Sequence, residues 1–316
     1  MKKLTLTITL ALLAPPLLWA AEEGDAPASP PVTGEANEQR VMPSAQQTRI
    51  NGLIERLSTN RAHEIETIEA NGESFLGLFE ESASGDPQGC LLMLHNDHGH
   101  PDWPQVISPL RHSLPEHSWC TLSIEIPDVE DRAALTTPEV ANIDGDNTSV
   151  ALPNEETVFA RINAAQQRIR EKGYNQVAYL GYRTGAAYAL RYAAENNISG
   201  QALILIEPRT IAPMTDFQFS QEIRRLRLSV LDYYFDHTYR AHQFARMRES
   251  AANKRTVRNQ NYVQINAVPD ARYDATGDKR LEQRVWGFLK QNTVQRNQRK
   301  ELPEFEKSLF FDSPLD

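Results

Sequence analysis

Short apolar runs alternate with helical segments through most of this chain, and this alternation limits the folds open to it. Strands that are joined through helices must lie parallel, with the helices covering both faces of the sheet. Ahead of them, Asn71-Gly72 separates two short strand-like runs and is typical of a β-hairpin turn. The sequence predicts an α/β fold with a mostly parallel sheet, opened by an antiparallel hairpin. The expected later strands are residues 90–94, 120–126, 176–180, 202–206, 226–233 and 262–268.

The segment Gly181-Tyr182-Arg183-Thr184-Gly185 lies between an apolar run at 176–180 and a helical run at 186–194. This order of strand, sharp turn and helix resembles the G-x-S-x-G nucleophile elbow of α/β-hydrolases. Arg183 stands where that motif has its nucleophile. A guanidinium stays protonated at neutral pH and offers no lone pair, so Arg183 cannot attack a carbonyl.

The other parts of a hydrolase site can be sought by position. The loop at 95–104 follows the first parallel strand, and its His95 and Gly99 resemble the start of the family's oxyanion loop. For the acid, Glu207 ends one strand and Asp232 lies within the next; Asp232 fits the family position better. The expected histidine is missing from 269–277. Arg183 and Asp232 therefore mark degenerate triad positions, and no catalytic residue is expected.

Several motifs in a fixed order carry a closer resemblance. With His95 they are the stretches 101–104, 119–127, 181–186 and 284–289. Together they resemble the DUF3530 family, bacterial α/β-hydrolase-fold proteins with no assigned function, over roughly residues 50 to 291. The resemblance implies the α/β-hydrolase fold and names no substrate.

Three interpretations of Arg183 remain open. It forms an internal ion pair with Asp232 or Glu207, since buried arginines are usually paired. It helps to form an anion pocket with the N–H groups of Thr184 and of the Asn96 loop. Or it faces solvent in a misplaced elbow. The binding residues expected for the pocket are Arg183, Thr184, His95, Asn96, Tyr182 and Glu207.

These features favour a pseudoenzyme that binds a small anionic ligand or a periplasmic protein partner. The alternative is an active hydrolase, esterase or peptidase-like, with an unconventional site. No cofactor is expected. Five potential metal ligands gather in one loop, but their spacing matches none of the usual zinc motifs, so no metal site is predicted. They are His95, Asp97, His98, His100 and Asp102.

The ends of the chain predict export. Met1-Lys2-Lys3 precedes an apolar run at 4–20, and Ala20-Ala21 supplies small residues for cleavage. Residues 1–21 are expected to be a signal peptide to the periplasm, with an uncleaved anchor as the alternative, and no stable membrane span after cleavage. Residues 22–45 are expected to be a flexible linker, 46–291 the α/β-hydrolase-like domain and 292–316 a tail. The net charge of −9 argues against a nucleic-acid partner.

Cys90 and Cys120 are the only two cysteines, and each lies near the start of an expected strand. In an oxidising compartment they could form a disulfide that closes a loop of about 30 residues, worth about 3 kcal/mol. Two buried free thiols are the alternative, because a bridge between adjacent strands needs favourable geometry.

Overall fold

The computed structural model describes residues 45–129, 150–196, 202–235, 238–256, 261–267 and 275–298. The expected signal peptide, nearly all of the linker and most of the tail lie outside these residues, so those assignments stay predictions. Among the described helices, none combines the length and the apolar character that a bilayer crossing requires.

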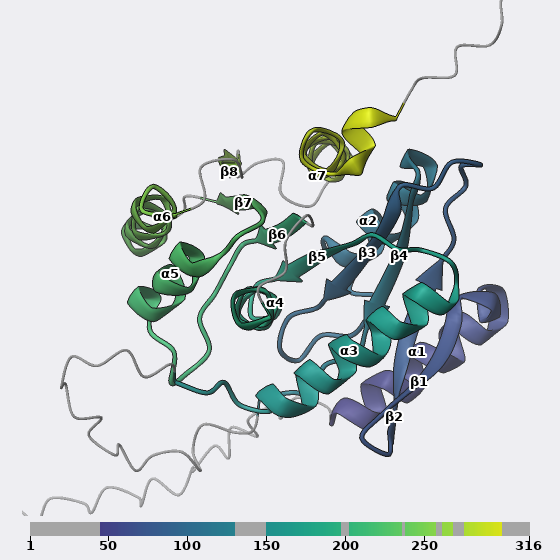
Figure 1. The fold of residues 1–316 in the computed structure, drawn as a ribbon. Coiled ribbons are helices and arrows are strands. Elements are labelled where there is room, and N and C mark those ends of the chain that lie inside the picture. Colours follow the sequence, from purple (N-terminus) through teal and green to yellow (C-terminus); the bar gives the residue numbers. More distant parts are fainter. Residues whose placement is uncertain are drawn as a thin grey trace, which may run out of the picture. The chain divides into compact units, whose positions relative to one another are not determined.

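The described strands form one eight-stranded sheet in the order β1-β2-β4-β3-β5-β6-β7-β8 (Figure 1). The pairs β1–β2 and β2–β4 are antiparallel and the others are parallel, which confirms the predicted sheet. Asn71 and Gly72 both have positive φ, as the predicted hairpin turn requires. The strands are β1 Ile65–Ala70, β2 Glu73–Glu80, β3 Gly89–Leu94, β4 Trp119–Ile124, β5 Val177–Tyr182, β6 Ala202–Ile206, β7 Ser229–Phe235 and β8 Tyr262–Ala267.

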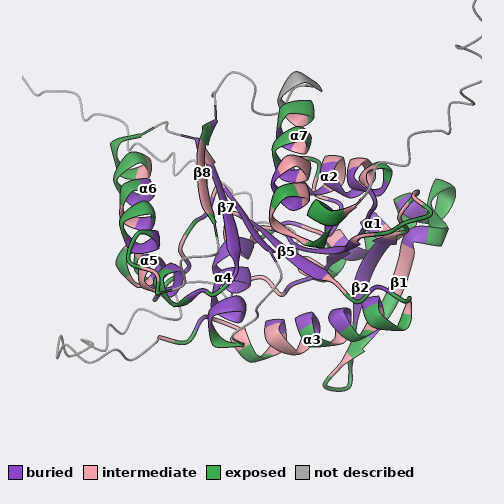
Figure 2. Ribbon diagram, turned by 45° about the horizontal axis from the view of Figure 1, so that its top comes forward, coloured by how far each residue is buried: buried purple, intermediate pink, exposed green. Residues whose placement is uncertain are grey.

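Helices cover both faces of the sheet. Apolar side chains of α3 to α6 share one buried cluster with the sheet, whereas those of α2 and α7 share a second and those of α1 a third. Figure 2 shows the central strands buried between helices whose outer sides are exposed, whereas the edge strands β1 and β8 are less buried. The helices are α1 Gln46–Asn60, α2 Ile107–Ser113, α3 Glu155–Glu171, α4 Gly185–Glu195, α5 Asp216–Arg225, α6 Tyr239–Ala252 and α7 Ala275–Asn292.

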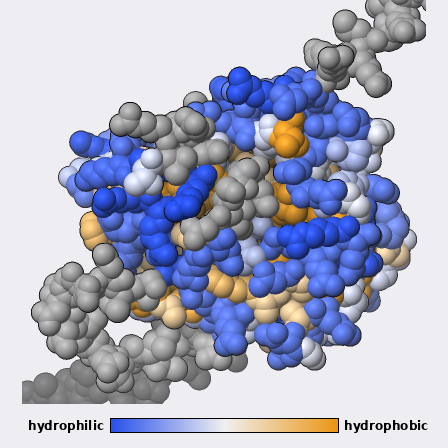
Figure 3. Space-filling model, in the orientation of Figure 1, coloured by the Kyte–Doolittle hydropathy of each residue, from blue (hydrophilic) through white to orange (hydrophobic). Residues whose placement is uncertain are grey.

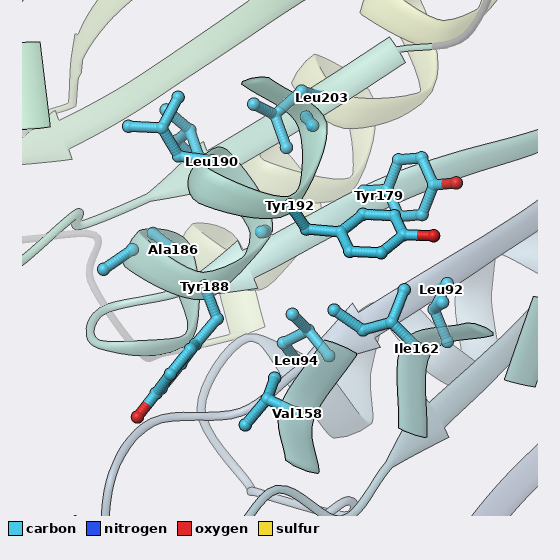
Figure 4. Close-up of a cluster of buried hydrophobic side chains, with 14 of the residues drawn as sticks. Leu92, Leu94, Val158, Ile162, Tyr179, Ala186, Tyr188, Leu190, Tyr192 and Leu203 are labelled. Atoms are coloured by element: carbon cyan, nitrogen blue, oxygen red, sulfur yellow. The ribbon is translucent and has the colours of Figure 1, made fainter. Parts of the chain in front are cut away.

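The central strands are buried on both sides, which explains their continuous apolar sequences. In β3, Leu92 and Leu94 join the cluster on the α3–α4 side, whereas Leu91 and Met93 join the α2–α7 side. Figure 4 shows Leu94 beside Val158 of α3, with α4 lying over the same cluster. The helix that carries the elbow is therefore packed into the core and gives the site a rigid base.

Cys90 and Cys120 lie directly opposite each other in the β3–β4 register, and their sulfur atoms are bonded. Of the two alternatives left by the sequence, the structure contains the disulfide. The bridge joins the two strands near their amino ends, away from the carboxyl edge at which the elbow lies.

Candidate functional site

The elbow at residues 181–185 has the close backbone packing that its glycines permit. A Cβ on Gly181 would lie 2.4 Å from the Ala186 Cα, and one on Gly185 would lie 2.4 Å from the His95 carbonyl oxygen. Arg183 between them has a φ of 51°, a left-handed conformation that costs free energy for a residue with a side chain. The predicted strand, sharp turn and helix are thus present, with Arg183 at the apex.

The Arg183 side chain pairs with Glu207, the first residue after β6. The Arg183 Nε donates to the Glu207 Oε2 at 3.0 Å, and the guanidinium carbon lies 5.1 Å from the centre of the Tyr182 ring. The side chains of Arg183 and Glu207 are 25% and 12% exposed, so the pair is partly open to solvent. Glu207 also has positive φ, at 46°. The carboxyl ends of β5 and β6 therefore carry a cation and an anion in facing, left-handed positions.

Asp232 does not occupy the acid position that the sequence suggested. It lies inside β7, opposite Leu205 of β6 and Gln264 of β8, with its side chain fully buried. Its carboxylate accepts from the Nε and Nη2 of Arg248, at 2.8 and 3.1 Å, and from the Tyr262 hydroxyl at 2.6 Å. Of the two partners that the sequence left open for Arg183, Asp232 pairs with Arg248 instead, and Glu207 is the partner of Arg183.

His95 is a structural residue, which corrects its expected place in a binding pocket. Its side chain is buried, its Nε2 accepts from the Ile126 N–H at 3.1 Å, and its Nδ1 lies 2.7 Å from the Asn96 carbonyl oxygen. This arrangement requires the neutral tautomer with a proton on Nδ1. Burial lowers the pKa of His95 to about 4. His95 therefore anchors the loop after β3 and has no ring nitrogen left to act as a base.

The buried neutral His95 should make folding stability depend on pH. Its pKa is about 4 in the folded state and about 6.5 when unfolded, so between these values the unfolded chain binds the extra proton. The free energy of unfolding should therefore fall as pH drops from about 6.5 to 4, by up to about 3 kcal/mol from this residue. Urea denaturation across this range measures it. His95→Gln, which can keep both hydrogen bonds, should make the free energy of unfolding depend less on pH over this range. An unchanged pH dependence in this variant would contradict the assignment.

The loop after β3 is tied to the elbow through Thr184. The Asp97 N–H donates to the Thr184 Oγ1 at 2.6 Å. The N–H groups of His98 and Gly99 donate within the loop, to the Asp97 Oδ1 and the Asn96 carbonyl. The expected anion pocket therefore needs correction, because these loop amides are already engaged. At the start of α4 the N–H groups of Ala186 and Ala187 are engaged too, by the carbonyl oxygens of Arg183 and Thr184 at 3.1 and 3.0 Å. The Arg183 guanidinium, which Glu207 shares, is therefore the donor that this site offers an anion.

The remaining predicted site residues are Tyr182 and Asn96. Tyr182 is buried, so it contributes the ring beneath Arg183 and not a ligand-facing surface. The Asn96 side chain donates to the Asp97 carbonyl at 2.8 Å, while its Oδ1 is buried without a hydrogen-bond partner among the described residues. Both residues support the elbow from within the protein.

The five potential metal ligands of the sequence do not converge. Two of them, Asp97 and His98, lie close to Asp128, which follows β4, and the potential ligand atoms of these three residues are within 4.8 Å of one another. Arg49 already binds both carboxylate oxygens of Asp128 at 2.7 Å, so a metal ion would have to compete with it. The sequence-based expectation of no metal site stays a prediction.

A cavity of about 520 Å³ lies at the carboxyl ends of β6 and β7, beside Glu207. The first turns of α5 and α6 close its sides, and Phe217 and Tyr239 in those turns are largely exposed. Elsewhere the described surface in Figure 3 is mostly hydrophilic. Sequence reasoning missed this cavity. Its lining includes Glu207, Arg209, Asp216, Arg240, Phe244 and Arg248.

The solved structures that this chain resembles include a dienelactone hydrolase and an esterase. A dienelactone hydrolase from Anabaena variabilis matches with a TM-score of 0.51 and 14% identity, over 73% of this chain and 100% of that one. An esterase from Pyrococcus furiosus matches with a TM-score of 0.51 and 11% identity, over 72% of this chain and 90% of that one. This similarity confirms the α/β-hydrolase fold.

A search of curated proteins finds no match to this chain. The family described as proteins of unknown function, DUF3530, matches residues 1–291. This match spans the elbow, the cavity and nearly all of α7. The chain therefore belongs to the DUF3530 family.

Proposed function

We propose that this protein is an exported α/β-hydrolase-fold protein that binds an anionic ligand or a protein partner without hydrolysing it. The observation that carries the proposal is the Arg183–Glu207 ion pair at the elbow, 3.0 Å from Nε to Oε2. Acyl transfer requires a nucleophile whose proton a base removes. Arg183 offers neither a nucleophile nor a base at neutral pH.

The described residues around Arg183 offer no replacement for the missing groups. Thr184 carries the adjacent hydroxyl, but its oxygen accepts from the Asp97 N–H, and no histidine of the described part of the chain hydrogen-bonds to it. The sequence has no histidine after His242, whereas the fold places its catalytic histidine after the last strand. Loss of the nucleophile and of the base together supports a binding role, because each is of little use to hydrolysis without the other.

The same geometry suits an anion. A partly exposed arginine and the amino end of α4 meet at the apex of the elbow, and both favour negative charge. Glu207 now balances the Arg183 charge. An incoming carboxylate or phosphate would compete with Glu207 for the guanidinium, so binding here would be reversible and sensitive to salt.

Export to the periplasm belongs to the same proposal. The basic start and apolar run of residues 1–20 support it. The Cys90–Cys120 disulfide supports it independently, since such bridges persist mainly in oxidising compartments.

An active hydrolase with an unconventional site is the second candidate, favoured by the fold that this chain shares with esterases. A fluorophosphonate probe, which labels activated hydroxyl nucleophiles, decides between the two. The purified protein should remain unlabelled and should not hydrolyse p-nitrophenyl acetate above the buffer rate. Arg183→Ser should be equally inactive, because the restored hydroxyl has no histidine to deprotonate it. A fluorophosphonate-reactive esterase serves as the positive control.

Covalent labelling of the wild-type protein that Thr184→Val abolishes would overturn the proposal and identify Thr184 as a nucleophile. Ester turnover by Arg183→Ser would instead reveal a base that the described residues do not contain. Circular dichroism of each variant excludes misfolding as the cause of inactivity.

A further inference from the structure

The cavity beside Glu207 is lined by a positively charged side chain, Arg248, which hydrogen bonds hold in a fixed orientation. Arg248 is buried and lines this cavity. Its Nε and Nη2 donate to Asp232, which also accepts from Tyr262 and Gln264. A guanidinium clamped in this way loses little freedom when it binds a ligand, which lowers the entropic cost of association. The nitrogen that Asp232 does not engage is Nη1.

Aromatic rings surround the same guanidinium. The Arg248 guanidinium carbon lies 4.3 Å from the centre of the Phe244 ring and 5.6 Å from that of Tyr234. Both rings line the cavity, together with Phe235. The cavity wall therefore combines a fixed cation with apolar surface, a combination that suits a ligand with a charged head and an apolar body.

Among the described residues, the charges in and beside the cavity leave one positive charge without an ion-pair partner. Glu207 pairs with Arg183, Asp232 pairs with Arg248, and Asp216 lies 3.5 Å from the Arg240 Nε. Arg209 makes no ion pair with any described residue, and it lines the cavity at its exposed side. The described lining itself contains three arginines and two carboxylates, Glu207 and Asp216, which favours a ligand with a single negative charge.

We propose that this cavity binds an amphipathic monocarboxylate, with its head group at Arg209 and Arg248 and its apolar body against Phe244 and Tyr234. This head-group position is separate from the one at Arg183, which does not line the cavity, so the proposal goes beyond the proposed function and adds a neighbouring anion site. A volume of about 520 Å³ falls within the range of about 300–1,000 Å³ usual for small-molecule sites. A carboxylate bound by arginines forms charge-assisted hydrogen bonds, which a neutral amide of the same shape cannot form.

Isothermal titration calorimetry with 4-phenylbutyrate tests the proposal, with 4-phenylbutanamide as the matched neutral ligand. The carboxylate should bind at least about tenfold more tightly than the amide, the difference expected of charge-assisted hydrogen bonds. Arg209→Gln should weaken carboxylate binding by about tenfold and leave amide binding unchanged. Arg227→Gln is the control, because Arg227 is an exposed arginine at the opposite, amino end of β7 and should bind like the wild type.

Equal affinity for the carboxylate and the amide would overturn the proposal, as would equal effects of Arg209→Gln and Arg227→Gln. The proposal would also be overturned if binding of the carboxylate did not saturate up to about 10 mM, because such an affinity is too weak for specific recognition. Failure of the proposed function has a different signature, which is fluorophosphonate labelling or ester turnover. A protein that prefers the carboxylate yet reacts with the probe would retain this binding site and lose the non-hydrolytic assignment.

Discussion

Gly185→Ala is expected to destabilise the folded protein by about 3 kcal/mol or more. The new Cβ would lie 2.4 Å from the His95 carbonyl oxygen and 2.5 Å from that of Leu94. Overpacking usually costs about 1–3 kcal/mol, and it costs more where the neighbouring atoms cannot move. Here they are backbone atoms of β3 and its following loop, which the sheet and the His95 hydrogen bonds hold in place. Urea denaturation measures the change in the free energy of unfolding.

Two other glycines give matched controls for this substitution. Gly52 lies in α1 and Gly287 in α7, and a Cβ on either would meet no atom within 4 Å. Alanine should stabilise these helices by up to about 1 kcal/mol, since it has the higher helix propensity. Gly181→Ala should behave like Gly185→Ala, because its Cβ would lie 2.4 Å from the Ala186 Cα. Wild-type stability of Gly185→Ala would mean that α4 and β3 do not approach this closely.

The elbow was predictable because close packing of the backbone within a short segment requires its two glycines. Where a strand turns directly into a helix, backbone segments approach so closely that no Cβ fits between them. Glycines at 181 and 185, on either side of Arg183, are therefore the sequence signal of this turn. The sheet was predictable for a similar reason, since strands buried on both faces have continuous apolar sequences. These signals are carried by single segments and need no knowledge of distant residues.

The helix α5 and the cavity were not predicted. Only four residues of α5 are buried, and the mean character of the helix is polar, so the apolar signal is weak. The stronger signal was its capping box, in which Thr215 and Gln218 exchange hydrogen bonds at the start of the helix. The cavity depends on two helix starts and two strand ends that are distant in sequence. No local pattern brings Arg209 and Arg248 together.

Asp232 was misassigned because sequence does not reveal how far a strand continues. The apolar run of β7 reaches Phe235, three residues beyond Asp232, so this carboxylate points from the middle of a strand and not from its end. Glu207 follows the last residue of β6 directly and so reaches Arg183. An error of a few residues in the predicted end of β7 was thus enough to assign the core residue Asp232 to the site.

Asp232→Asn is expected to destabilise the protein by about 3–5 kcal/mol, because it removes the negative charge that balances buried Arg248. The double variant Asp232→Leu with Arg248→Met should be more stable than Asp232→Asn, since it removes both charges together. Arg240→Gln is the control: its pair with Asp216 is long and its side chain is 83% exposed, so the loss should stay below about 1 kcal/mol. Urea denaturation of the four proteins measures these differences.

The same series separates the two consequences of the Asp232–Arg248 pair. If Arg248 binds the ligand, the double variant should be more stable than Asp232→Asn and yet bind 4-phenylbutyrate more weakly than the wild type. The reason is that no guanidinium remains at the base of the cavity. Wild-type affinity in the double variant would place the carboxylate elsewhere. Wild-type stability of Asp232→Asn would mean that groups other than Asp232 compensate the charge of the buried Arg248.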